Sequence, residues 1–277
     1  MRYRKSSFCV LNPCTGEYFN LPTIDNEGSI VGGFGYDPST SNYKIVRIEY
    51  LKDKGYVQVY TLGSSGWRSI GEINHQLRRH REGVLWKGSL HWLDVNQGKV
   101  LAFDLADETF RRYLPETPCI NINTEITQFK LLGGYLSIVA VDRRIRRVNI
   151  WALKYTQHKN DDILLEVGKY QWSLEFSIPF FASPYGYTVD CNYDPFDITK
   201  NNEVLLWHTL KPQGWSTTPT FLFRYDPKTD TLKEVLHWKT YHIVTFKGIP
   251  HVNSHVSLKA LGVDSKTTKV AAHCADH

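Results

Sequence analysis

The sequence predicts an all-β fold, a β-propeller-like (kelch-like) array of about five to six four-stranded blades. A strand–turn–strand phrase returns along the chain, and the predicted outer hairpins begin near Val10, Val57, Val100 and Val148. This spacing falls in the range of about 40–50 residues that is typical of propeller blades. The chain is also 13% aromatic, and aromatic side chains suit half-buried pleated sheets. No segment shows the pattern of a long amphipathic helix.

The copies of this phrase share a polar corner between two apolar strands. The copies read VLNPCTGEYFNL, VQVYTLGSSGWRSI, VLAFDLADETFRRY and FLFRYDPKTDTLKEV, together with FGYDPSTSNYKIV from Phe34. At Asn12-Pro13, Asp37-Pro38 and Asp226-Pro227 we expect the Asx side chain to accept a backbone N–H two residues on, while proline sets φ for the turn. The phrase therefore predicts tight hairpin corners.

Inner strand pairs lie between the outer hairpins and are more apolar. GVLWKGSLHWL turns at Lys87-Gly88 and FKLLGGYLSIVAV at Gly133-Gly134, and two-residue turns of this kind are strong hairpin signals. EVLLWHTL from Glu203 and HVSLKAL from His255 are the other two predicted inner strands. Near-continuous apolar runs suit strands that are buried on both faces. An inner and an outer pair together make a four-stranded blade.

The two ends of the chain matter for ring closure, because the first outer hairpin has no inner pair ahead of it. We expect strands around residues 242–246 and 255–261 to fill that place, which would remove exposed sheet edges. Without them the propeller is incompletely closed. A polar insertion near residues 157–162 separates VNIWAL from its partner YQWSLEFSI. The predicted domain spans residues 1–262, and residues 263–277 are predicted to be a frayed tail outside it.

Cysteine and charge patterns narrow the class of protein. The five cysteines are scattered without a CxxC pair, which argues against a disulfide framework or a zinc knuckle and favours a reducing compartment. The N-terminus lacks the apolar region of a signal peptide, and residues 131–141, the longest apolar run, are too short to span a bilayer. We expect a protein of the cytoplasm, the nucleus or both, with no membrane partner.

Two basic stretches stand out in a chain of net charge +5, namely residues 78–81 and 143–147. A nucleic-acid interface would interleave such charges with stacking aromatic residues, and neither stretch does so clearly. Solvent-exposed loops are the preferred interpretation, and nucleic acid is not an expected partner.

Several residue groups invite a catalytic or metal-binding interpretation, and each has a simpler structural one. Residues 32–35 (GGFG) precede a strand rather than a helix, so close backbone packing is preferred to a phosphate loop. His251 and His255 lie in a loop-to-strand transition and lack an evident third metal ligand. The acidic residues of the repeats are interpreted as turn formers at matching positions: Asp37, Asp104, Asp107, Asp226 and Asp230. No nucleophile motif occurs. We therefore predict no catalytic residue, metal or cofactor.

Seven segments, in order, carry a family resemblance: residues 12–22, 33–48, 57–70, 83–93, 100–115, 148–154 and 223–235. In them the chain resembles the plant F-box-associated domain, the β-propeller-like C-terminal half of plant F-box proteins. The resemblance covers the chain to about residue 262 and implies a non-catalytic substrate-recognition module of an SCF-type ubiquitin ligase. It implies a protein target as partner, and the Skp1 adaptor only if an F-box segment lies upstream, because none precedes Phe8 in this sequence.

The target would contact variable loops on the rigid scaffold. Length and irregularity point to residues 74–82, 143–147, 156–162 and 211–218. Trp215 is either a packing residue or an exposed binding aromatic, the kind of residue that interfaces favour. The candidate contact residues are Arg78, Arg79, Arg81, Arg143, Arg144, Arg146 and Trp215. The alternative function is a kelch-like propeller enzyme, an oxidase or glycan hydrolase, with a site at the propeller axis.

Overall fold

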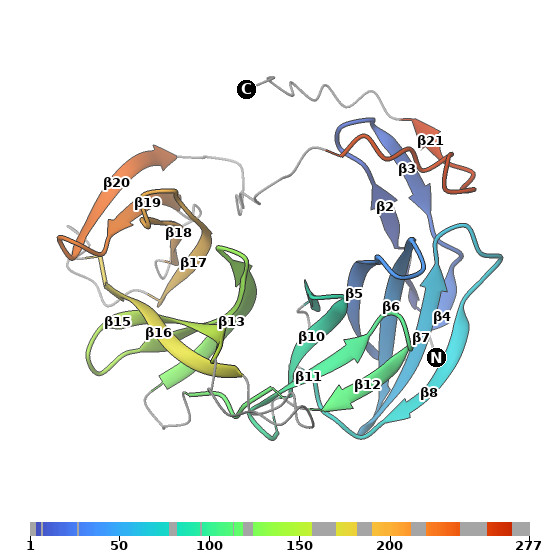
Figure 1. The fold of residues 1–277 in the computed structure, drawn as a ribbon, viewed down its shortest axis with the longest axis horizontal. Coiled ribbons are helices and arrows are strands. Elements are labelled where there is room, and N and C mark those ends of the chain that lie inside the picture. The colour runs from blue at the N-terminus through green and yellow to red at the C-terminus, as the bar shows by residue number, and fades with distance from the viewer. Residues whose placement is uncertain are drawn as a thin grey trace. The chain divides into compact units, whose positions relative to one another are not determined.

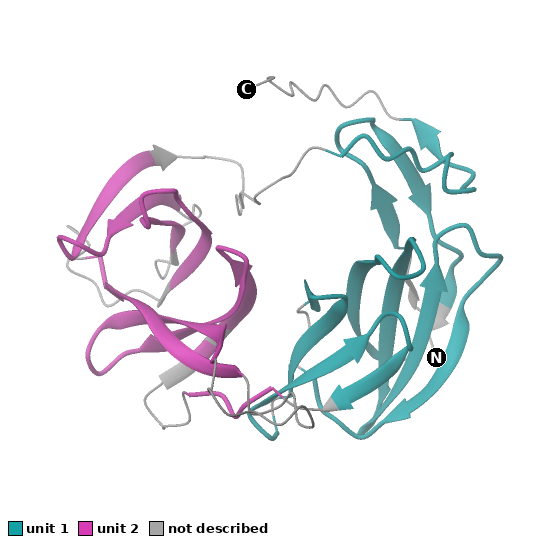
Figure 2. Cartoon of the chain, viewed as in Figure 1, with its two compact units in different colours: residues 1–113, 251–277 teal, residues 114–250 magenta. Residues whose placement is uncertain are grey.

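A computed structural model describes residues 4–6, 8–26, 28–77, 82–94, 96–112, 114–118, 124–156, 170–181, 190–211, 220–238 and 254–267. All regular secondary structure in these ranges is β, which confirms the predicted fold class (Figure 1). The chain divides into two compact units (Figure 2): unit 1 comprises residues 1–113 and 251–277, and unit 2 comprises residues 114–250. The described strands form four four-stranded sheets, one three-stranded sheet and one two-stranded sheet.

Unit 1 contains two of the four-stranded antiparallel sheets. The first has the order β5-β6-β7-β8, with β5 (Ser29–Asp37), β6 (Asn42–Leu51), β7 (Lys54–Thr61) and β8 (Arg68–Ile73). The second has the order β12-β11-β10-β9, with β9 (Val84–Trp86), β10 (Ser89–Asp94), β11 (Lys99–Asp104) and β12 (Thr109–Arg112). Each sheet combines an inner and an outer hairpin, as the sequence predicts.

The smaller sheets of unit 1 involve its two termini. One has the order β2-β3-β21, with β2 (Cys9–Leu11), β3 (Glu17–Asn20) and β21 (Lys266–Thr267). The other pairs β1 (Arg4–Ser6) with β4 (Ile24–Asn26). The first outer hairpin, β2–β3, is thus extended by residues from the opposite end of the chain.

Unit 2 contains the remaining two four-stranded sheets. One has the order β13-β14-β15-β16, with β13 (Thr124–Leu132), β14 (Tyr135–Asp142), β15 (Arg147–Tyr155) and β16 (Tyr170–Pro179). The other has the order β17-β18-β19-β20, with β17 (Asp190–Ile198), β18 (Val204–Lys211), β19 (Thr220–Asp226) and β20 (Thr231–Trp238). Strand β17 is not among the predicted elements, and its register shifts between Pro195 and Asp197.

Six hairpin corners in the described residues follow one rule. The Asx side chain accepts the backbone N–H two residues on at 2.9–3.0 Å in six corners, which begin at Asn12, Asp37, Asp94, Asp104, Asp142 and Asp226. The residue four positions after each Asx has positive φ: Gly16, Ser41, Gly98, Glu108, Arg146 and Asp230. This combination returns the chain into an antiparallel partner strand. The predicted Asx corners are confirmed, and the sequence analysis overlooked those at Asp94 and Asp142.

The GGFG segment allows the two four-stranded sheets of unit 1 to meet closely. It lies inside β5, and a parallel bridge joins Gly33 to Gly83 just before β9. The Trp92 indole nitrogen donates to the Gly32 carbonyl oxygen at 3.1 Å. A Cβ on Gly83 would lie 2.5 Å from the Trp92 ring, so neither bridging position has room for a side chain. The packing interpretation of this segment is confirmed, although its place is mid-strand rather than at a strand entry.

The core of unit 2 lies between its two sheets. Val139, Ile150 and Phe176 of the first sheet pack with residues of the second such as Leu206 and Phe223. At the edge of this core the Gln128 amide donates to the Tyr193 carbonyl oxygen at 3.0 Å. This apolar contact and polar bond join neighbouring sheets of the unit.

Residues 254–267 differ from the predicted strand at 255–261. They run beside the β2–β3 corner without forming a strand before β21, because side chains of that corner bind their backbone. Asn12 donates to the Ser254 and Val256 carbonyl oxygens at 2.9 and 2.8 Å. Leu258 is buried and Val263 is 5% exposed, so ordered packing continues beyond residue 262. Residues 242–246 lie outside the described part of the chain.

Candidate protein-binding surfaces

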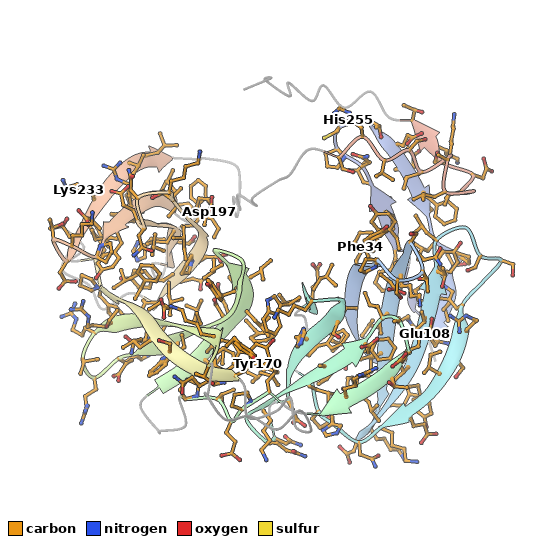
Figure 3. All side chains as sticks on the ribbon, viewed as in Figure 1. Phe34, Glu108, Tyr170, Asp197, Lys233 and His255 are labelled. Atoms are coloured by element: carbon orange, nitrogen blue, oxygen red, sulfur yellow. The ribbon has the colours of Figure 1, made fainter. Side chains whose placement is uncertain are left out.

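An apolar groove opens in unit 1 where β2, β5 and β6 meet the C-terminal segment. Its volume is about 190 Å³, and it is lined by Val10, Leu11, Asn12, Pro13, Phe34, Tyr43, Leu62, Ser254, Val256, Leu258 and Leu261. Figure 3 labels Phe34 on β5 and His255 on the segment beside β2–β3. The strands thus bring together residues that are far apart in the sequence.

The alternation of β5 explains why the groove is apolar and open. Val31, Gly33 and Gly35 face the packed side of the strand, whereas Phe34 and Tyr36 face the other. Phe34 is 46% exposed and stacks on Tyr43 of β6 with ring centroids 5.7 Å apart. Stacked rings present a firm apolar surface that loses little entropy on contact. The groove is therefore suited to an apolar side chain of a partner.

The C-terminal wall of the groove is fixed by hydrogen bonds. The Glu17 carboxylate accepts the Leu258 N–H at 2.7 Å and the Ser257 hydroxyl at 2.9 Å. These bonds, led by the one from the Leu258 N–H, hold the pKa of Glu17 below its ordinary value. Glu17 is therefore charged at neutral pH, where it accepts both bonds.

The second candidate surface is the corner between β14 and β15, which we call the arginine corner (residues 142–146). Arg143, Arg144 and Arg146 are all exposed there, and Ile145 between them is 50% exposed. The structure thus places three of the predicted contact residues together on one hairpin. Arg78, Arg79, Arg81 and Trp215 lie outside the described residues, as do most of the other predicted contact loops.

A charge cluster between the two large sheets of unit 1 has a structural role. Lys44 of β6 donates to the Leu105 carbonyl oxygen at 2.5 Å and lies 3.0 Å from the Glu108 carboxylate. Arg68 of β8 also binds Glu108, at 2.7 Å. Burial would raise the pKa of Glu108, but the bonds from Arg68 and Lys44 outweigh it and lower the pKa. Glu108 therefore acts as an ionic tie between the sheets.

The acidic residues of the repeats do not all occupy matching positions. Asp37, Asp104 and Asp226 open their corners, whereas Asp107 and Asp230 lie three and four residues further on. Asp230 accepts bonds from Arg147 at 2.6 Å and from the Tyr225 hydroxyl at 2.9 Å. The structural interpretation of the acidic residues agrees with these contacts, but turn formation explains only the first three.

The described residues show neither a metal-binding cluster nor a membrane-spanning helix. These ranges contain no group of three or more His, Cys, Asp or Glu side chains arranged to hold a metal ion. His255 is exposed, and His251 lies outside the described ranges. Over the same residues, no helix has the length and apolar character needed to cross a membrane.

The sequence matches a known protein family over most of its length. The sequence model described as "F-box associated beta propeller domain" matches residues 1–255. The chain belongs to this F-box-associated β-propeller family. The match confirms the predicted family resemblance, and the four-stranded sheets are the blades of this family's fold.

Relatives of this F-box-associated chain are F-box proteins of Arabidopsis thaliana. F-box protein At3g07870 is 26% identical over 88% of this chain and 62% of its own length. F-box protein At1g47340 is 24% identical over 84% of this chain and 48% of its own length. F-box/LRR-repeat/kelch-repeat protein At2g27520 is 33% identical over 39% of this chain and 32% of its own length. The chain thus spans less than two thirds of the length of these relatives.

The solved structures that match this chain are more distant from it in sequence. An oligogalacturonate lyase in complex with manganese matches 84% of this chain and 73% of its own at 8% identity and a TM-score of 0.39. A likeness at this level carries no argument about the activity of this chain.

The apolar groove is not predictable from local sequence. Its residues come from the first hairpin, from β5 and β6 and from the C-terminal segment, so no local motif marks it. One local signal was available: Phe34 and Tyr36 alternate with glycines, and this alternation places both aromatic side chains on the same face of a strand.

Proposed function

We propose that this chain is the non-catalytic target-recognition domain of a substrate receptor for an SCF-type ubiquitin ligase. The observation that carries the proposal is the family match over residues 1–255. The sheets supply a rigid scaffold, and the apolar groove and the arginine corner supply contacts to a protein target. The proposed site of action is the cytoplasm, the nucleus or both.

Delivery of the target would require a second partner. The relatives At3g07870 and At1g47340 carry the name F-box protein, and this chain spans only part of their length. We propose that Skp1 binds through a segment upstream of the recognition domain. A pull-down would compare the present chain with a version extended upstream in the genome. Skp1 retained by the extended version alone supports the assignment, whereas Skp1 retained by neither contradicts it.

The groove is tested by a matched pair of aromatic substitutions in unit 1. Phe34→Ser removes an exposed ring that lines the groove, and Tyr56→Ser removes an exposed ring of β7 that does not. Proteins captured from plant extract are quantified for the wild type and both variants. We expect one set of proteins to be lost with Phe34→Ser and kept with Tyr56→Ser. Equal capture by all three would remove the groove from the proposal.

A further inference from the structure

We propose that the arginine corner recognises an acidic protein segment that carries an apolar side chain. This inference rests on the proposed function, because it names the chemistry of a target that such a domain would bind. The corner presents Arg144, Ile145 and Arg146 to solvent in consecutive positions. Arginine pairs with carboxylates through charge-assisted, often bidentate hydrogen bonds, and an adjacent Ile adds apolar contact.

The other corners of the same chain provide an internal reference. Their fourth position holds Thr15, Thr40, Gln97, Asp107 and Thr229, all of them polar, where the arginine corner has Ile145. An Ile that is 50% exposed contributes little to the packing of a turn. The turn rule that explains the other corners therefore leaves Ile145 without a structural reason.

Arg146 is a second departure from that rule. It has φ +56°, a left-handed conformation that Gly16 and Gly98 occupy in two of the other corners. At the same position Glu108 and Asp230 have structural partners, because they tie one sheet to the next. No such ion pair to Arg146 is seen in the described residues, so its guanidinium is available for a partner from outside the chain.

The backbone of the corner is held in place from several sides. Asp142 accepts the N–H groups of Arg144 and Ile145 at 3.0 and 3.2 Å. The Arg146 carbonyl oxygen accepts the Phe180 N–H at 2.9 Å. A corner whose backbone is already fixed loses less conformational entropy when a partner docks, and this favours binding.

The carboxylates near the corner are already engaged. Asp230 is bound by Arg147 and Tyr225, and Asp226 accepts the Lys228 N–H at 2.9 Å. Lys228 and Lys233 of the neighbouring corner and strand are exposed, and Figure 3 labels Lys233 on β20. The corner itself exposes three arginines and uses its carboxylate, Asp142, inside the turn, so its exposed charge is positive and complements an acidic segment.

A protein partner is favoured over nucleic acid by the composition of the corner. Single-stranded nucleic acid is bound through aromatic side chains that stack on bases, together with basic residues. Residues 142–146 include an aliphatic Ile at the tip and no aromatic residue. The tip thus provides apolar contact without a stacking surface.

Fluorescence anisotropy would test the proposal with a labelled peptide of glutamates around one leucine. The control peptide has glutamine in place of every glutamate. We expect the acidic peptide to bind the wild type and to weaken as salt rises. The variant Arg144→Glu/Arg146→Glu should weaken binding by about tenfold or more, since both charge-assisted contacts are lost. The matched variant Lys52→Glu/Lys200→Glu changes two exposed lysines elsewhere by the same charge and should bind as the wild type does.

Arg146→Gly separates recognition from folding. It relieves the left-handed conformation, so we expect an equal or higher unfolding temperature together with weaker peptide binding. Unchanged binding in both arginine variants would overturn the proposal, as would stronger, arginine-dependent binding of a single-stranded oligonucleotide. Either result would leave the Skp1 and groove experiments unaffected, so failure here is distinguishable from failure of the proposed function.

Discussion

At the scale of single residues, the buried polar groups are the most informative. Asp37 is 2% exposed and accepts hydrogen bonds from the Ser39 N–H at 2.9 Å and from the Thr40 hydroxyl at 2.5 Å. Lys44 lies 3.7 Å away. Burial opposes ionisation of Asp37, but these bonds and the Lys44 charge outweigh it and hold its pKa at about 2. One carboxylate thus closes its corner and balances a buried lysine.

Asp37→Ala is predicted to lower the free energy of unfolding by about 2–4 kcal/mol, because a charged acceptor is lost and Lys44 keeps only part of its compensation. Urea denaturation of the protein, followed by tryptophan fluorescence, measures the change. Because the folded pKa of Asp37 lies below the unfolded value, its contribution is present above about pH 4 and is lost as pH falls towards 2. A loss of stability that is the same at pH 7 and at pH 2 would contradict this assignment.

His208 is a buried titratable residue of unit 2. It is 1% exposed, neither ring nitrogen has a hydrogen-bond partner among the residues that the structure describes, and its ring centroid lies 4.5 Å from that of Tyr193. Burial lowers the pKa of His208 to about 4. In unit 1, burial lowers the pKa of His91 to about 4 as well, against opposing hydrogen bonds to backbone oxygens. Both rings are therefore neutral in the folded protein at neutral pH.

We predict that stability falls as pH drops from 6.5 towards 4. Between these values the unfolded chain binds protons at both histidines and the folded chain does not, so acid favours unfolding by about 2 kcal/mol for each histidine at pH 5. Denaturation at pH 7.5 and pH 5 measures the difference. His208→Phe should reduce it, and the matched variant His255→Phe, at an exposed position, should not. If His208→Phe left the pH dependence intact, the burial argument would fail.

At the scale of elements, glycines determine where strands turn and where sheets touch. Gly134 has φ +82° with open space around its Cβ position, whereas Gly83 has a ring of Trp92 at that position. The first glycine is required for backbone conformation and the second for close approach. The two requirements predict different responses to the same substitution.

Gly83→Ala is predicted to destabilise unit 1 by about 2 kcal/mol or more, because its Cβ would overlap the Trp92 ring between two sheets. Gly32→Ala is the matched control: it lies one residue from the Gly33 bridge, and its Cβ would meet only the Val46 carbonyl oxygen at 3.9 Å. Thermal unfolding of both variants measures the contrast. Equal unfolding temperatures would show that the two sheets do not approach as closely as described.

Gly134→Ala is predicted to cost about 1 kcal/mol through backbone strain alone. Gly66→Ala serves as its control, since it too has open space at Cβ but no positive φ. The difference in unfolding free energy between the two variants isolates the conformational contribution. A smaller loss for Gly134→Ala than for Gly66→Ala would argue against the two-residue turn.

The sequence predicted these elements where the signals are local. The Asn12-Pro13, Asp37-Pro38 and Asp226-Pro227 corners are marked by proline, and the Gly133-Gly134 turn by its glycines. The corners at Asp94 and Asp142 carry neither proline nor a following threonine, so they were missed. Residues 255–261 look like a strand in sequence, but bonds from Asn12 and Glu17, about 240 residues away, hold them in another conformation. The groove was not predictable for the same reason: its walls meet only in the folded chain.

At the scale of the whole molecule, unit 1 is built from both ends of the chain. Residues 254–267 cover Leu21 and Tyr60 with Leu258 and Val263, and β21 pairs with β3. These contacts join the two parts of unit 1 that are far apart in the sequence, whereas unit 2 is continuous in sequence. The last described residues are therefore part of the first unit's core.

A chain ending at residue 253 is predicted to lose stability in unit 1, since it leaves Leu21 and the β3 edge uncovered. A chain ending at residue 267 keeps these contacts and is the control. Limited proteolysis with mass spectrometry locates the change. We expect faster cleavage within residues 8–73 in the shorter chain and unchanged cleavage within residues 124–156. Equal cleavage of both chains would contradict the role assigned to the segment.

This discontinuity has a consequence for synthesis on the ribosome. Domains generally fold as they emerge, the N-terminal one first. Here unit 2 is synthesised in full before unit 1 receives its closing segment, because residues 254–267 follow unit 2 in the sequence. The β2–β3 hairpin must therefore wait, with Leu21 uncovered and the groove lacking one wall, until unit 2 has been translated. Chaperones would meet exposed apolar surface of unit 1 during the synthesis of unit 2.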